Sequence, residues 1–276
     1  MLKFGIHVIG FSGVDFVAKF GDRIAIGHAH GATDLGFYQK ACLVYDNCLD
    51  LVSTPLHTVA MVGLSKMREN VQELWRAWSK AISTLAFFAM PSFGILAVTS
   101  RDVLILVLGE KWETASIVLS VLAIRGIPHV VERTVGWLHT AAGRSDRLMK
   151  WGVIATIAQL VALFAGLPFG AIGVATAYVV CMFILFLPAI AYSGRPLGIG
   201  VMHVIRAVGA QLAGALVAVG IGFVLRETLL SEMPKLSRAV VLALSYVVSY
   251  FAIVVGLFRV TAPLKVGRSI LREISA

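Results

Sequence analysis

Eight long apolar segments dominate this sequence of 276 residues. A helix needs about 20 mostly apolar residues to cross roughly 30 Å of hydrocarbon, and each of the eight is that long. The chain is 58% hydrophobic and 14% charged, whereas about 25% of the residues in soluble domains are charged. We predict an all-α polytopic membrane protein with about eight transmembrane helices, approximately Leu2–His28, Leu35–Leu64, Trp75–Val98, Thr114–Ala141, Leu148–Leu167, Ala171–Tyr192, Ile199–Leu225 and Ser237–Leu257.

Three shorter features complete this organisation. Val103–Leu108 is apolar but too short to cross, so we expect it to lie at the membrane interface. Residues 259–276 have the pattern of a basic helical tail. Asp15 interrupts the first apolar segment, which favours a retained span over a cleaved signal peptide.

The basic residues indicate an orientation. The net charge of +9 would suit a nucleic-acid partner, but the Lys and Arg residues cluster in alternate short loops. With a cytoplasmic N-terminus, fourteen of them fall on the cytoplasmic side and five on the opposite side. Cytoplasmic loops carry such an excess in membrane proteins. We therefore predict both termini in the cytoplasm and no nucleic-acid partner.

Charged side chains lie deep within three of the eight segments. In the first and fourth, they recur at i, i+4, i+7 and i+8, which places each set within an arc of about 100° on its helix. Charges in hydrocarbon are costly and usually face a protein interior or a hydrated cavity. We predict a cavity lined by Asp15, Lys19, Asp22, Arg23, Lys40, Asp46, Asp50, Arg125, His129, Glu132 and Arg133. Two alternatives are structural pairing, as of Asp15 with Lys19, and an interface to another subunit.

The sequence gives little sign of a metal site or an enzyme. His28 and His30 could begin a metal site, but only Asp34 lies near enough in sequence to add a ligand, so we expect no metal and no cofactor. His129 lies midspan beside Arg125 and Glu132, which leaves a proton-relay role open. No catalytic triad, phosphate-binding glycine loop or glycosidase-like carboxylate pair stands out, so we expect no enzymatic activity.

The segment Gly21–Ala41 carries a family resemblance. Its spacing, Asp22-x4-Gly27-x3-Gly31-x3-Leu35-Gly36-Phe37-Tyr38-x2-Ala41, resembles the start of the second half of the polysaccharide transporters, the Wzx-type lipid-linked oligosaccharide flippases of the MOP superfamily. Further elements that resemble this family follow in order: Pro91–Gly94, Leu108–Trp112, Ala142–Arg144 and Gly170–Ala175.

The resemblance implies a domain organisation. Family members usually carry two six-helix lobes, often followed by an extra helix pair. Residues 1–194 would then be a lobe like the second one, and residues 195–276 the extra pair with its basic tail. The first lobe would be supplied by a homodimer or by a separately encoded half.

The resemblance also implies a function and a location. This would be the transport of polyprenyl-pyrophosphate-linked oligosaccharide across the bacterial inner membrane, for lipopolysaccharide or exopolysaccharide synthesis. The cationic candidates would screen the pyrophosphate, and the acidic ones would pair with them, bind sugar hydroxyls or couple to an ion. The alternatives are a drug or cation antiporter of the same superfamily, an inert fragment, and a membrane enzyme of polysaccharide assembly, for which the loops are too short.

Overall fold

The structure is a computed structural model. It describes residues 2–66, 71–141, 145–195 and 200–260, with side chains described for residues 20–54, 72–134, 136, 147–195 and 200–260. The described chain is helical, and its order is α1 (Leu2–Lys66), α2 (Val71–Leu108), η1 (Glu110–Trp112), α3 (Glu113–Ala141), α4 (Ser145–Gly166), η2 (Leu167–Phe169), α5 (Gly170–Gly194), α6 (Val201–Thr228), α7 (Lys235–Phe251) and η4 (Ala252–Leu257). The prediction of an all-α membrane protein is confirmed.

Each predicted span lies within one of these helices or closely overlaps one. Five stretches of the described residues are long and apolar enough to cross a membrane. The longest, Arg147–Gly194, contains two predicted spans, which are separate helices, α4 and α5, joined by η2. Val103–Leu108 does not form a separate interfacial piece. It continues α2 without a break, because Leu104 and Ile105 are buried in the packed helices.

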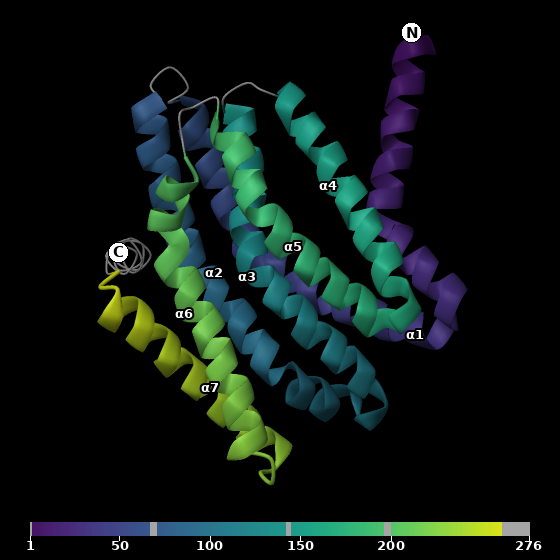
Figure 1. Ribbon diagram of the computed structural model, residues 1–276, viewed down its shortest axis with the longest axis vertical. Coiled ribbons are helices and arrows are strands. Elements are labelled where there is room, and N and C mark those ends of the chain that lie inside the picture. Colours follow the sequence, from purple (N-terminus) through teal and green to yellow (C-terminus); the bar gives the residue numbers. More distant parts are fainter. Residues whose placement is uncertain (1, 67–70, 142–144, 196–199, 261–276) are drawn as a thin grey trace, which may run out of the picture.

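A single glycine turns α1 back on itself. The two predicted spans of α1 meet at Gly31, whose backbone has φ 82° and ψ −177°. Essentially only glycine adopts this conformation, since a side chain would clash there. Figure 1 shows the two halves of α1 diverging from this kink, so that both can pack in the bundle. The chain therefore bends sharply at Gly31, between the two spans of α1.

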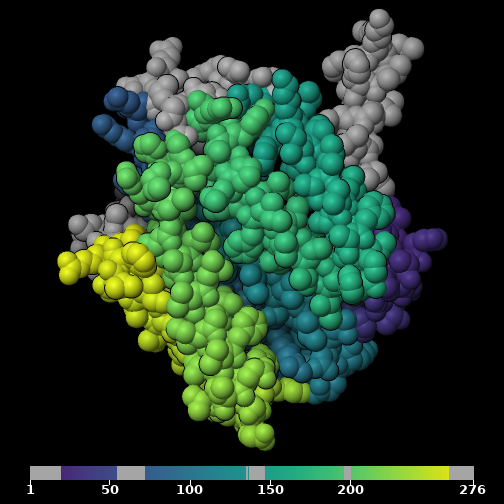
Figure 2. Space-filling model, viewed as in Figure 1, coloured from purple at the N-terminus to yellow at the C-terminus, as the bar shows by residue number. Residues whose placement is uncertain are grey.

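The helices alternate in direction across one bundle. The last turns of α1, α3 and α5 lie at one end of the molecule, and the kink of α1 lies at the other (Figure 1). This alternation fits the charge pattern, in which basic loops gather on one side. α2 and α3 pack together at the centre, and α6 and α7 pack on α2. In Figure 2, α4 and α5 form one part of the surface and α6 with α7 another.

Glycines allow the closest helix contacts in the core. A side-chain carbon on Gly94 of α2 would lie 2.0 Å from the hydroxyl oxygen of Tyr246 in α7. One on Gly126 of α3 would lie 2.1 Å from the ring of Phe93. Tyr246 and Phe93 are fully buried. Small residues at helix contacts are typical of membrane bundles, in which close van der Waals packing drives association.

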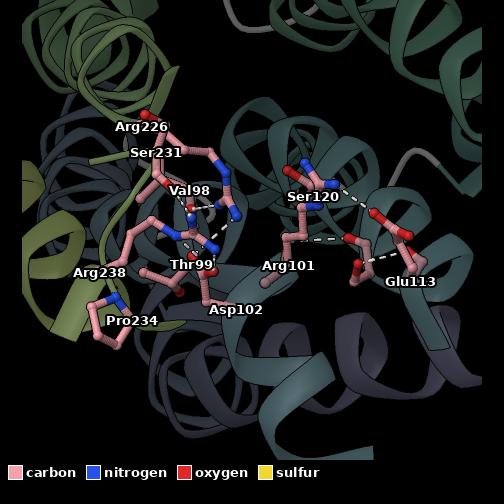
Figure 3. A network of polar contacts seen from close by, with 12 residues as sticks. Val98, Thr99, Arg101, Asp102, Glu113, Ser120, Arg226, Ser231, Pro234 and Arg238 are labelled. Carbon is pink, nitrogen blue, oxygen red and sulfur yellow. Dashed lines mark hydrogen bonds and ion pairs between the residues drawn. The ribbon is translucent and has the colours of Figure 1, made fainter. Parts of the chain in front are cut away.

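A buried carboxylate fastens the last two helices to α2. Asp102, which is 1% exposed, accepts hydrogen bonds from the Nε and Nη2 atoms of Arg238 at 2.9 and 2.6 Å. Its other oxygen lies 3.1 Å from Nη2 of Arg226, whose Nη1 donates to the carbonyl of Val98. Figure 3 shows the two guanidinium groups converging on Asp102 from α6 and α7. One acid therefore joins three helices.

We predict that Asp102→Asn destabilises the folded protein strongly. Removing one partner of a buried ion pair costs about 3–5 kcal/mol, because the remaining charge is left uncompensated. Denaturant unfolding in mixed micelles measures this change. Glu113→Gln is the matched control, since Glu113 pairs with Arg101 with both side chains about half exposed, and exposed pairs contribute about 0–1 kcal/mol. Equal effects of the two substitutions would contradict this account of Asp102.

Candidate functional site

A polar cavity of about 140 Å³ lies within the bundle. Both halves of α1 contribute to it, together with α3, α4 and α5. Its described lining consists of Asp22, Arg23, Tyr38, Cys42, Tyr45, Asp46, Leu122, Arg125, Gln159 and Tyr178. The kink at Gly31 brings Asp22 and Arg23 back beside Tyr38 and Asp46, which lie on the other half of α1. The structure therefore brings four of the predicted site residues together around one cavity: Asp22, Arg23, Asp46 and Arg125.

The two carboxylates of the cavity have partners. The hydroxyl of Tyr38, which is fully buried, donates to Asp22 Oδ2 at 2.7 Å. Arg23 Nη2 lies 3.8 Å from Asp46 Oδ2. Each pairing joins the first half of α1 to the second. The acidic side of the cavity is therefore engaged in holding α1 in its bent form.

Arg125 is different. Its guanidinium lies over the ring of Tyr178, 5.4 Å from the ring centroid. This group makes no hydrogen bond and no ion pair with any residue whose side chain the structure describes, and its Nε is buried. A cation–π contact compensates only part of the cost of burying a cation. Arg125 is therefore available to an anion that enters the cavity.

A second polar chain leads away from the cavity along α3. The hydroxyl of Tyr45 and Nδ1 of His129 are 2.6 Å apart and share a hydrogen bond, and their rings stack. His129 Nε2 lies 3.9 Å from Glu132 Oε2. Glu132 and Arg125 line a smaller cavity of about 20 Å³ next to the first. A proton-relay role for His129 stays a prediction. The imidazole lies between the Tyr45 hydroxyl and the Glu132 carboxylate, two groups that could exchange protons with it.

The remaining predicted residues lie elsewhere. Arg133 donates to Asp50 at 3.1 Å, and both side chains are more than a third exposed. Lys40 does not line the described cavity. Its ammonium lies over the ring of Trp112, 5.7 Å from the centroid, because that turn of α1 faces η1. The side chains of Asp15 and Lys19 lie outside the described residues.

Sequence reasoning missed the aromatic and amide part of the lining. Tyr38, Tyr45 and Tyr178 enclose the cavity, and Gln159 adds an amide from α4. A signal was present, since Tyr38, Cys42 and Tyr45 recur at i, i+4 and i+7 and so share a helix face. Tyr178 and Gln159 show that α5 and α4 also contribute polar groups to the cavity.

The sequence of this chain is similar to those of polysaccharide biosynthesis proteins. Residues 1–117 match a family described as polysaccharide biosynthesis protein. The teichuronic acid biosynthesis protein TuaB of Bacillus subtilis is 28% identical over 167 residues, which are 60% of this chain and 35% of TuaB. The lipopolysaccharide biosynthesis protein WzxC of Escherichia coli is 25% identical over 184 residues, which are 66% of this chain and 37% of WzxC. The chain thus matches about a third of the length of these relatives.

A solved structure resembles the fold over most of the chain. The lipid II flippase MurJ, in an inward closed conformation, aligns with a TM-score of 0.70 at 17% sequence identity. The alignment covers 89% of this chain and 51% of MurJ. At this identity the likeness concerns the fold alone. Sequence and fold together confirm the predicted resemblance: the chain is a multi-pass membrane protein similar in sequence to polysaccharide biosynthesis proteins and similar in fold to half of the MurJ structure.

Proposed function

We propose that this chain forms part of a transporter that moves polyprenyl-pyrophosphate-linked oligosaccharide across the bacterial inner membrane. The observation that carries the proposal is the cation of Arg125, which lines a polar cavity without a carboxylate partner among the described side chains. A pyrophosphate would supply the missing negative charge with charge-assisted hydrogen bonds. The names of the relatives TuaB and WzxC, both biosynthesis proteins for surface polymers, support the class of substrate.

The cavity also argues against the antiporter alternative. A site for organic cations needs an unpaired acid, but in the lining of this cavity Asp22 is bonded to Tyr38 and Asp46 is paired with Arg23. The nearby acid Glu132 lies outside this lining, in the small neighbouring cavity that it shares with Arg125. Within the lining of the polar cavity, the charge left without a partner is positive, which disfavours a cationic ligand. A carrier of an anionic lipid head group suits this unpaired positive charge better than an exporter of cationic drugs does.

A second lobe completes the proposal. On α1, Asp46 and Asp50 are 55% and 64% exposed at the side chain. Charges facing lipid cost roughly 2.5–3.5 kcal/mol each at the bilayer centre. We infer that an opposite lobe, either a second copy or a separately encoded half, covers this face. Residues 1–194 would act as one lobe and residues 195–276 as an added pair, with both termini in the cytoplasm. The two lobes would rock between inward-open and outward-open states.

We predict that Arg125→Ala abolishes surface polysaccharide while the amount of protein in the membrane stays near normal. Arg125→Lys should retain part of the activity, because the charge remains but the bidentate geometry is lost. Complementation of a flippase-deficient strain, with immunoblotting of membranes, measures both quantities. Arg101→Gln is the matched control, because Arg101 pairs with Glu113 far from the cavity, and it should transport normally. Full activity of Arg125→Ala would rule out a substrate role.

We predict that a cysteine at Asn47 cross-links to a partner in native membranes. Asn47 is exposed on the polar face of α1, next to Asp46. Ser53, further along α1, is buried and bonded to the Leu49 carbonyl within its own helix, so it is a poorer site. The three native cysteines are first replaced by alanine. A cysteine at Leu244, on the exposed apolar face of α7, is the control and should not cross-link. A monomer that complements the strain without any cross-link would contradict the second lobe.

A further inference from the structure

A large apolar groove separates α4 from α5. Its volume is about 710 Å³, within the range of roughly 300–1,000 Å³ typical of ligand sites. Small residues line both walls, among them Ala158, Ala162 and Ala165 of α4 and Gly173 and Ala177 of α5. The hydroxyl of Thr176 in the lining is bonded to the Ile172 carbonyl of its own helix. The groove therefore offers hydrocarbon contacts and hardly any free polar group.

The packing of the two helices creates this groove. At η2 their backbones touch, since a side-chain carbon on Gly166 would lie 2.6 Å from the Gly173 carbonyl oxygen. Figure 1 shows α4 and α5 closest at this end and further apart toward the other. The small side chains of the walls leave the space between them unfilled. The outer rim is exposed at Val161, Val180 and Ile184, so the groove opens to the surface that faces lipid.

The groove adjoins the polar cavity, with a small cavity between the two. Cys181 and Leu185 line both the groove and the small cavity beside it. That small cavity in turn shares Arg125, Gln159 and Tyr178 with the polar cavity. The groove, the small cavity and the polar cavity therefore lie side by side, separated by the side chains that they share, from the exposed rim of α4 and α5 to the guanidinium of Arg125. An amphiphile with an anionic head and a single long chain matches both ends of this arrangement.

We infer that the groove between α4 and α5 holds the isoprenoid chain of a polyprenyl phosphate or pyrophosphate whose head group lies at Arg125. This inference rests on the proposed function and adds a second subsite to it. The chain stays in contact with apolar walls while the phosphate reaches the polar cavity past Tyr178. The two acyl chains of a phospholipid fit a groove that is walled by only two helices less well.

Filling the groove tests this inference. In Ala177→Phe the added ring occupies the groove, and Ala158→Leu narrows it from the opposite wall. Ala191→Phe is the matched control, because Ala191 is exposed on the same helix and is not part of the groove lining. The full 276-residue chain in nanodiscs is titrated with a long-chain polyprenyl phosphate, with geranyl phosphate and with phosphatidylglycerol. Thermal unfolding of each variant checks that it is folded.

We expect Ala177→Phe and Ala158→Leu to weaken binding of the long-chain polyprenyl phosphate about tenfold, because buried apolar area is lost. Geranyl phosphate, whose chain is too short to fill the groove, should bind as before, and Ala191→Phe should change neither. Unchanged long-chain binding in both folded groove variants would overturn the inference, as would an equal loss for phosphatidylglycerol. In those cases Arg125→Ala should still weaken the binding of geranyl phosphate, and that result would support the proposed function independently of the groove. If Arg125→Ala leaves geranyl phosphate binding unchanged, the proposed function itself fails.

Discussion

Charged side chains are costly in hydrocarbon, and this constraint shapes the described bundle. At one end, Asp102 is shared by Arg226 and Arg238, which lie far along the chain. In the middle, Asp22 and Asp46 are engaged across the bend of α1 by Tyr38 and Arg23. Each arrangement supplies an internal partner for a charge. The pairs of Asp102 hold α6 and α7 to α2, and the pairs of Asp22 and Asp46 hold the two halves of α1 together.

Arg125 has no anionic partner among the described side chains, and this unpaired charge is the basis of the proposed function. A buried guanidinium that has only a ring for a partner raises the free energy of the empty state. An anionic ligand that restores the missing interaction gains binding free energy at that place. Because α1 is bent at Gly31, the cavity draws on both of its halves, so a change in that bend would alter the site directly. The apolar groove between α4 and α5 extends the same site toward the lipid.

Much of the fold could be predicted from the sequence, because a span leaves a local signal. The length of apolar runs gives the helices, and the i, i+4, i+7 spacing of charges gives the faces of α1 and α3 that meet at the cavity. Partners far apart in the chain leave no such signal. The convergence of Arg226 and Arg238 on Asp102 depends on how three helices pack, and so does the position of Lys40 against Trp112. The tyrosines of the lining were not predicted, because a tyrosine within an apolar segment is usually interpreted as a residue of the packed core. The continuation of α2 through Val103–Leu108 followed from burial of Leu104 and Ile105, which a hydropathy pattern alone does not reveal.

The most direct test of the central claim is a cryo-electron microscopy structure of this chain, with its partner lobe, bound to a polyprenyl-pyrophosphate-linked oligosaccharide. The account predicts phosphate density within hydrogen-bond distance of the Arg125 guanidinium, with Tyr178 still packed against that group. Phosphate density at another place, with Arg125 paired instead to a carboxylate of the partner lobe, would contradict it.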